Sequence, residues 1–491
     1  MLSAPGCAEG RWHDSRTALP WDEETWDAIY SACSRGYFTR LWIVQEIHQG
    51  GTNALLRCGR AEIPWSVFRR AVICIHAKAV GAPEKIWHKT QEIKFLCEDL
   101  SHMLFTDVLK NHHMRPCLDP RDKIYGLLSL APDEVAQYVA PDYRTSLLDV
   151  FRGVFLAFVR HEARVSLLPY AGRRYGAVEK EGWPTWLPDW SHYLHVTAPH
   201  NVGFCASGTS ASQARYVDGG RLEVSALYFA SISCVGAKIA TEDFAGFRKT
   251  CKVLGLDRLR DAPYPSRGTY RDAWLETLAL GRVEDRHYGA GYPSLVDLAA
   301  MVAAPEGTVS EKEKGLSTGW KIWTTGRING CYLFSTQNGY VGIINGEPQQ
   351  GDEIFVVLGC NMPMLLRPTA SGEYEVVGDC YVHGIMDGEA LFGSIPPPWT
   401  AQVGADADNH VRIMYYNEEN GTLYRDHQRL QEVPIPPGWK EITEWDKSRA
   451  DPLYCKKFYN KETDSVINSD PRMFPEAFRE RGIPIETITL V

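Results

Sequence analysis

The sequence predicts an α+β protein in which a mainly helical first third is followed by a β-rich region. Between residues 22 and 160, apolar side chains recur at the three- or four-residue spacing of amphipathic helices. Between residues 327 and 390, short apolar runs are separated by glycine-containing turns, as in antiparallel strands. The length of 491 residues allows two to three domains, and no internal repeat is present.

The composition is that of a globular protein that works inside the cell. Hydrophobic residues make up 44% of the chain, charged residues make up 23%, and the net charge is -9. Since no stripe of Lys and Arg stands out, we expect no nucleic-acid partner. The 13 cysteines include no Cys-x-x-Cys pair, which favours free thiols in the cytoplasm. Residues 1–10 lack a secretory signal, and the most apolar helical run, residues 154–159, is too short to span a membrane.

Residues 22–48 predict two helices with a break at residues 34–36. The second helix should bury one face, whose apolar residues lie at helical spacing: Leu41, Val44 and Ile47. Trp42 and Glu46 are four residues apart, so they share a different face of this helix. A short strand is then expected at 53–57.

More helices are expected before residue 160. Pro64 suits the first turn of a helix that runs through the seventies, and another helical stretch covers 84–110. The run Asp119–Asp122 is a helix start, because Asp119 can cap it while Pro120 fits its first position. The run Ser146–Asp149 resembles a capping box for a helix that extends to about residue 160.

The β-rich region carries hairpin signals. Residues 217–220 contain Asp-Gly-Gly between strand-like runs, and Asn338-Gly339 predicts a type I′ turn between two apolar runs. Further strands are expected at 354–358 and 374–382. We expect these strands to form a small barrel or sandwich, while residues 240–320 are mixed and helical.

Three motifs resemble the fungal heterokaryon-incompatibility (HET) domain family: the run 36–46, the run 119–125 and Trp186-Leu-Pro-Asp-Trp190. The resemblance implies a TIR-like α/β fold. In that family the first motif lies in the middle of the domain, whereas here it lies near residue 40. The chain thus resembles an N-terminally truncated HET protein, or one whose gene model lacks its 5′ portion. Blocks at 351–354, 366–368 and 381–389 resemble the region downstream of the domain in long HET proteins.

We therefore predict six segments. They are an unstructured N-terminus (1–20), the C-terminal half of a HET domain (21–195), a mixed connecting region (196–325), a β-rich domain (326–400), a linker (401–432) and a degenerate WW-like segment with its tail (433–491).

Glu46 is the best candidate for a catalytic residue. HET domains distantly resemble TIR domains, some of which cleave NAD with a Glu four residues after a Trp, and Trp42 and Glu46 have that spacing. A carboxylate near the ribose could stabilise the positive charge that develops as the nicotinamide bond breaks. The alternative is structural, and we favour it for this chain: Trp42 is a core aromatic residue and Glu46 pairs with Arg40 or another cation. The chain has no evident phosphate loop, so no cofactor is expected.

The other motif residues are predicted to be structural. Arg121 could lie near an anion, but a bridge from a helix cap to a neighbouring element explains the pattern better. No metal site is expected, since the His residues match no Cys pair. The residues that we assign to motif or structural roles are Arg40, Gln45, Asp119, Arg121, Asp122, Tyr125, Asp142, Tyr143, Trp186, Asp189, Trp190 and Trp439.

The segment after residue 433 resembles a WW module, a three-stranded sheet that binds proline-rich peptides. Trp439, Asn460 and Pro471 fit that pattern, but the second Trp of the binding platform would fall at Asn468. Proline-rich ligands are therefore not expected. By resemblance, HET proteins act in self/nonself recognition and trigger cell death. We expect this chain to act through protein partners. The alternative is a TIR-like NAD glycohydrolase that uses Glu46 if the missing N-terminal half is present or is supplied by self-association.

Overall fold

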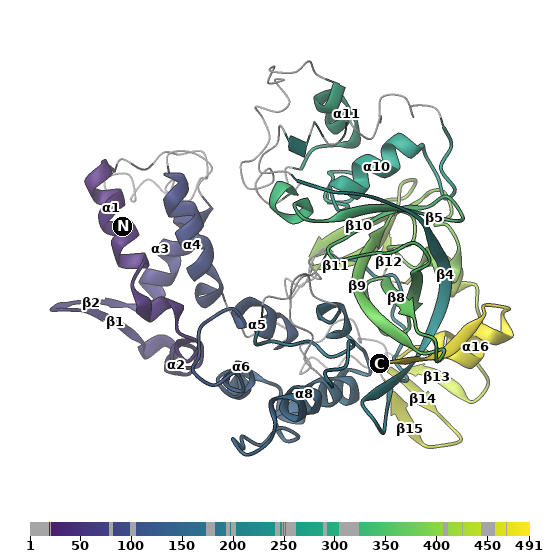
Figure 1. Cartoon of the computed structure of the whole chain (residues 1–491), viewed down its shortest axis with the longest axis horizontal. Helices are drawn as coiled ribbons and strands as arrows, with labels where there is room; N and C mark the ends of the chain where they lie inside the picture. Colours follow the sequence, from purple (N-terminus) through teal and green to yellow (C-terminus); the bar gives the residue numbers. More distant parts are fainter. Residues whose placement is uncertain are drawn as a thin grey trace. The chain divides into compact units, whose positions relative to one another are not determined.

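The structure is a computed structural model that describes residues 19, 21–77, 82–98, 105–172, 182–192, 197, 203–240, 246–247, 249, 251, 262–287, 292–303, 324–405, 411–424, 426–442, 457–467 and 469–491. Two compact units are present (Figure 1). The helical unit comprises Met1–Val154 and Trp190–Tyr193, and the barrel unit comprises Phe155–Asp189 and Leu194–Val491. Helices and sheets are both present, so the α+β prediction is confirmed.

The helical unit begins with the two helices that the sequence predicts. Its elements are α1 (Glu23–Cys33), η2 (Gly36–Thr39), α2 (Ile43–Gly50), η3 (Gly51–Asn53), β1 (Leu55–Cys58), β2 (Ala61–Pro64), α3 (Trp65–His76), α4 (Glu84–Cys97), α5 (Phe105–His112), α6 (Asp122–Tyr125), η5 (Leu128–Leu130), α7 (Asp133–Ala136) and the first half of α8 (Leu147–Glu162). Within the described part of this unit, the strands form one antiparallel hairpin. The TIR-like architecture therefore stays a prediction.

Local signals explain where these helices begin and what they bury. The Asp22 carboxylate accepts a hydrogen bond from the Thr25 amide at 2.9 Å, which caps α1. The predicted cap of α8 also forms, because the Asp149 amide donates to Ser146 Oγ at 3.1 Å. Pro64 ends β2 and is the residue before α3. The predicted apolar face of α2 is buried, as are the packed side chains of α1, α3 and α4: Trp26, Ile75 and Ile86.

A closed barrel of six strands dominates the barrel unit (Figure 1). Hydrogen-bonded pairs run in the order β4–β5–β6–β9–β8–β7 and return to β4. The strands are β4 (Arg221–Lys238), β5 (Tyr332–Thr336), β6 (Val341–Ile344), β7 (Glu353–Val357), β8 (Met364–Pro368) and β9 (Tyr374–Val382). The expectation of a barrel or sandwich is thus resolved in favour of a barrel, which has no free edge along this ring.

Closure depends on β4, which at 18 residues is long enough to pair with two neighbours. Its residues 226–231 pair with β7, whereas residues 232–238 pair with β5. Irregularities in the register interrupt both pairings, and such bulges bend a strand and raise its twist. At Gly342 of β6 a Cβ atom would lie 2.6 Å from the Tyr381 carbonyl oxygen, so only glycine permits this approach of β6 to β9.

A buried ion pair joins two sequence motifs at one end of the barrel. Arg367 donates from Nε and Nη2 to both carboxylate oxygens of Asp352, each at 2.8 Å. The Asp352 side chain is 2% exposed and also accepts the Gln349 amide at 2.7 Å. The ion pair therefore fixes the turn before β7 to strand β8, and hydrogen bonding to Asp352 raises the pKa of Arg367.

Two predicted hairpins form in the barrel unit, one with a different turn. Strand β3 (Arg215–Val217) pairs with the start of β4, as expected from residues 217–220. Asn338 and Gly339 lie between β5 and β6, but Asn338 does not have the positive φ that a type I′ turn requires. The type I′ prediction is wrong because Thr336 pairs with Tyr340, which leaves a three-residue loop in which only Gly339 has positive φ.

The remaining elements surround or extend the barrel. They are η6 (Leu168–Tyr170), α10 (Tyr270–Leu278), α11 (Leu295–Ala303), α14 (Glu389–Phe392), β10 (Trp399–Ala405), β11 (Val411–Asn417), β12 (Leu423–Tyr424), α15 (Gln428–Gln431), β13 (Trp439–Ile442), β14 (Lys457–Asn460), β15 (Ser465–Ile467), η10 (Pro471–Met473), α16 (Pro475–Glu480) and β16 (Ile485–Leu490). Strand β16 pairs with the first part of β4. Among the helices that the structure describes, none has the length and apolar character needed to cross a bilayer.

Replacing Arg367 by Leu should destabilise the barrel by about 3–5 kcal/mol, because it leaves the Asp352 carboxylate buried without its cation. Equilibrium unfolding in urea measures this loss. The control is Arg215→Leu, which removes an ion pair with Glu223 in which Arg215 is 72% exposed. That variant should lose less than about 1 kcal/mol. Equal losses in the two variants would show that the buried pair does not stabilise the barrel.

Candidate functional site

Trp42 and Glu46 lie on an exposed face at the start of α2. Trp42 is 37% exposed, so it is not the core aromatic residue of the structural alternative. The Glu46 amide donates to the Trp42 carbonyl oxygen at 3.2 Å, which places the two residues one helical turn apart. Their predicted common face is therefore present and open to solvent.

The Glu46 carboxylate has few neighbours among the described residues that could assist catalysis. Its carboxylate forms no hydrogen bond or ion pair with any residue that the structure describes, and Arg40 is likewise exposed. Tyr37 is close by, since burial and then the charge of Glu46 raise the pKa of its phenol. Gln45 points its Oε1 inward, where it finds no partner among the described residues. Tyr37, Trp42 and Glu46 are thus three exposed residues of this region, and we call the surface that they form the ridge.

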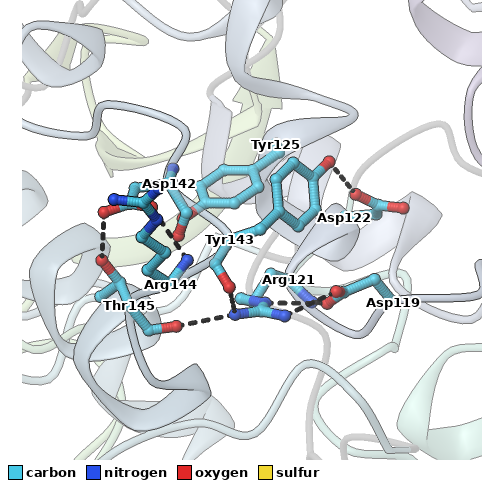
Figure 2. A network of polar contacts seen from close by, with 8 residues as sticks. All are labelled: Asp119, Arg121, Asp122, Tyr125, Asp142, Tyr143, Arg144 and Thr145. Carbon is cyan, nitrogen blue, oxygen red and sulfur yellow. Dashed lines mark hydrogen bonds and ion pairs between the residues drawn. The ribbon is translucent and has the colours of Figure 1, made fainter.

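A network of polar contacts joins the Asp119–Tyr125 motif to residues 142–145 (Figure 2). Asp119 Oδ1 accepts from the backbone amide of Arg121 at 2.9 Å and from its Nε at 3.0 Å. Asp119 Oδ2 accepts from Arg121 Nη2 at 2.7 Å. These bonds lower the pKa of Asp119 and hold the guanidinium in one orientation across Pro120.

Arg121 then reaches a second segment of the chain. Its Nη1 donates to the carbonyl oxygen of Tyr143 and, at 2.9 Å, to that of Thr145 (Figure 2). The guanidinium carbon also lies 5.4 Å from the centre of the Tyr143 ring. Nε, Nη1 and Nη2 of Arg121 all donate to groups of the protein. This arrangement is better explained by a structural bridge between two segments than by a site for an anion.

Two tyrosines and two aspartates complete the network. The Tyr143 hydroxyl donates to Asp122 Oδ1 at 2.7 Å, which raises the pKa of Tyr143 to about 12. The Tyr125 hydroxyl donates to the Asp142 carbonyl oxygen at 3.1 Å, and the two rings pack edge to face. Asp142 Oδ1 accepts the Arg144 amide at 2.8 Å. The five predicted residues of this region that follow Asp119 therefore meet in one place: Arg121, Asp122, Tyr125, Asp142 and Tyr143.

The same hydrogen-bond arrangement as at Asp119-Pro120-Arg121 recurs in the barrel unit at Asp470-Pro471-Arg472. Asp470 Oδ1 accepts from the Arg472 amide at 2.9 Å and from Nε at 3.0 Å, while Oδ2 accepts from Nη2 at 2.6 Å. Arg472 Nη1 donates to the carbonyl oxygen of Leu430 at 3.0 Å. Each Asp-Pro-Arg sequence therefore uses its carboxylate to aim an arginine at the carbonyl oxygens of a distant segment.

The Trp186–Trp190 motif is buried. Trp186 is 0% exposed, donates from Nε1 to the Gly220 carbonyl oxygen at 2.8 Å and packs against Phe155. Trp190 packs edge to face against Phe151, and Asp189 is 1% exposed. These positions support the predicted role of the motif in packing.

Trp439 belongs to a three-stranded antiparallel sheet, β13–β14–β15. It pairs with Asn460 across the first two strands and packs edge to face against Phe474. The Asn460 side chain accepts the Glu462 amide at 2.8 Å, which forms the turn between β14 and β15. Asn468, at the expected place of the second Trp, lies outside the described residues.

A cavity in the barrel unit is the feature that the sequence predictions missed. Its volume is about 500 Å³, and six carboxylates line it: Glu276, Glu284, Asp285, Asp387, Glu389 and Glu418. Asp387 and Glu389 stand out in the sequence as an acidic pair, but their partner Arg286 is about a hundred residues away. Only a prediction of contacts between distant residues could have placed Arg286 beside Asp387 and Glu389.

In the parts of the chain that are described, no three His, Cys, Asp or Glu side chains come together in a way that could hold a metal ion. The adjacent His112 and His113 are both buried. Arg115 Nε donates to His112 Nδ1 at 3.0 Å, and burial lowers the pKa of both imidazoles.

Replacing Arg121 by Lys should loosen residues 142–147, because an ammonium cannot hold Asp119 and the two carbonyl oxygens at once. Hydrogen exchange followed by mass spectrometry should show faster exchange in this segment. The control is Arg144→Lys, the same substitution in an exposed residue of the same loop. Unchanged exchange in Arg121→Lys would contradict the role of Arg121 as a bridge.

Comparison with known proteins connects the barrel to a family. Residues 308–392 match the Het-6 beta-barrel domain, and the described part of this match contains β5–β9 and α14. The chain is 26% identical over 340 residues to "Heterokaryon incompatibility protein 6, OR allele" of Neurospora crassa, an alignment that covers 56% of this chain and 49% of that protein. The chain thus spans about half the length of this curated relative, and no solved structure matches it. These findings confirm the resemblance to heterokaryon-incompatibility proteins.

Proposed function

We propose that the chain acts in fungal heterokaryon incompatibility, where it takes part in self/nonself recognition and the associated cell death through contacts with other proteins. The observation that carries the proposal is the match of residues 308–392 to the Het-6 beta-barrel domain, in a region that supplies β5–β9, five of the six strands of the closed barrel. The similarity to a heterokaryon incompatibility protein over 340 residues adds support outside that region.

The ridge of Tyr37, Trp42 and Glu46 is the surface that we propose for the protein contact. Tyr37 is 38% exposed and Trp42 is 37% exposed. Tryptophan and tyrosine are enriched among the residues that contribute most to protein interfaces, because they bury a large area with little loss of conformational entropy. An exposed carboxylate beside them adds specificity for a partner with a cationic group.

The alternative is a TIR-like NAD glycohydrolase that uses Glu46. It is favoured by one observation, the exposed Trp42 and Glu46 one turn apart on α2. A nucleotide would need further walls and groups that bind its phosphates beyond the described residues around Glu46, and self-association is one source of them. For this reason we rank the hydrolase second.

We also propose a WW-like segment near the C-terminus and a cytoplasmic location. The three-stranded antiparallel sheet β13–β15 supports a WW-like segment without its full platform. The described cysteines carry free thiols, which supports action in the reducing cytoplasm.

The test is the viability of heterokaryons in Neurospora crassa strains that express the chain or its variants with different partner alleles. Trp42→Ala should abolish an incompatibility reaction that the chain causes, because the largest side chain of the ridge is lost. Tyr138→Ala, a change at an aromatic residue of the same unit that is 55% exposed, is the control and should keep the reaction.

Glu46→Gln separates the two candidates. This change preserves the shape of the ridge, so a protein contact should survive it at least in part, whereas a hydrolase would lose its catalytic carboxylate. A reaction that persists in Trp42→Ala would overturn the proposed contact. A reaction lost in Glu46→Gln together with a fall in cellular NAD would favour the hydrolase.

A further inference from the structure

Two exposed charges of opposite sign flank the aromatic residues of the ridge. Arg40 follows η2 and Glu46 lies on α2, with Trp42 between them in the sequence. The pKa of the Tyr37 phenol is raised by burial and by the charge of Glu46, while the charge of Arg40 opposes this rise. Tyr37 therefore lies within reach of both charges, and all four residues belong to one surface.

Neither charge is compensated within the described part of the chain. The Arg40 guanidinium and the Glu46 carboxylate form no hydrogen bond or ion pair with any described residue, and they do not pair with each other. A guanidinium can pair with a carboxylate through two hydrogen bonds and can also stack on an aromatic ring. A surface that fits the ridge should thus offer a cation to Glu46, an anion to Arg40 and an apolar group to Trp42.

The ridge itself has this combination of groups. In a dimer with twofold symmetry the same patch of both subunits meets, so each contact between two different residues occurs twice. If the axis passes near Trp42, the tryptophans of the two copies meet close to it. Arg40 of each copy then faces Glu46 of the other. A partner that carries only cations would leave Arg40 unmatched, and one that carries only anions would repel Glu46.

The surface beside the ridge adds apolar area. Specific interfaces bury about 1,200 Å² or more in total, which three side chains cannot supply. Arg115 Nη1 donates to the carbonyl oxygen of Phe38, the residue after Tyr37, so the loop that follows α5 lies against η2. This loop exposes two large apolar side chains, since Met114 is 55% exposed and Leu118 is 102% exposed.

We propose that the ridge binds a second copy of this chain in a twofold symmetric dimer, with Trp42 near the axis and an Arg40–Glu46 ion pair on each side of it. The inference rests on the proposed function, because it names the partner of the surface to which that function assigns a protein contact. Its evidence is the complementarity of the ridge to itself: one unpaired cation, one unpaired anion and exposed aromatic residues on one surface.

The experiment is sedimentation equilibrium of the purified full chain over a range of concentrations. We expect a reversible equilibrium between monomer and dimer. Arg40→Glu and Glu46→Arg should each raise the dissociation constant at least about tenfold, because each variant places like charges opposite one another twice. Arg60→Glu is the control, a charge reversal at an exposed residue in the turn between β1 and β2, and it should leave the constant unchanged.

Reversing both charges in one chain tests whether the partner is a second copy. The double variant Arg40→Glu/Glu46→Arg should return the dissociation constant to within about threefold of the original, since opposite charges meet again across the axis. An equimolar mixture of the two single variants should form heterodimers for the same reason. A dissociation constant above about 1 mM for the unmodified chain, or a double variant that dimerises no better than the single ones, would overturn the proposal.

The heterokaryon assay separates failure of this inference from failure of the proposed function. An incompatibility reaction that Arg40→Glu abolishes and the double variant restores supports the dimer. A reaction that Trp42→Ala abolishes in a chain that sedimentation shows to be a monomer overturns the dimer alone, because the ridge then contacts another protein. A reaction that persists in Trp42→Ala overturns the proposed contact itself.

Discussion

Closure of the barrel through β4 is the constraint on which the barrel unit depends. One strand must pair with β7 through residues 226–231 and with β5 through residues 232–238, and it does so by bending at irregular positions. Closure buries a core that includes Ile232, Phe334 and Val356, and it leaves the barrel without an edge on which other chains could aggregate. The ion pair of Asp352 and Arg367 joins the turn before β7 to β8, two neighbouring strands of this ring.

In each unit, an aspartate two residues before an arginine holds the guanidinium of that arginine in place. In the helical unit Arg121 is held by Asp119, and in the barrel unit Arg472 is held in the same way by Asp470. Proline between the two residues limits the backbone, so the carboxylate reaches both the amide and the guanidinium of the arginine. The remaining nitrogen of each arginine, Nη1, then donates to carbonyl oxygens of another segment and so joins that segment to the Asp-Pro-Arg sequence.

Local features of the fold could be predicted from the sequence, because their causes lie within a few residues. The capping of α8 by Ser146, the break before α2 and the hairpin between β3 and β4 are examples. The turn at Gly339 was placed correctly but given the wrong type, since its geometry depends on how Thr336 and Tyr340 pair.

Long-range features could not be predicted from local patterns. The ring closure of β4, the ion pair of Arg286 with Asp387 and the cavity join residues that are far apart in the sequence. For the candidate site, the common face of Trp42 and Glu46 followed from helical spacing, but their exposure did not. Spacing alone cannot tell an exposed face from a face that another element covers.

The most direct test of the account is NAD consumption by the purified chain at high protein concentration, measured by chromatography beside Glu46→Ala. Since we propose that the ridge of Tyr37, Trp42 and Glu46 serves contact with a protein, neither form should consume NAD while both remain folded. Consumption by the unmodified chain that Glu46→Ala abolishes would contradict the account and establish the hydrolase.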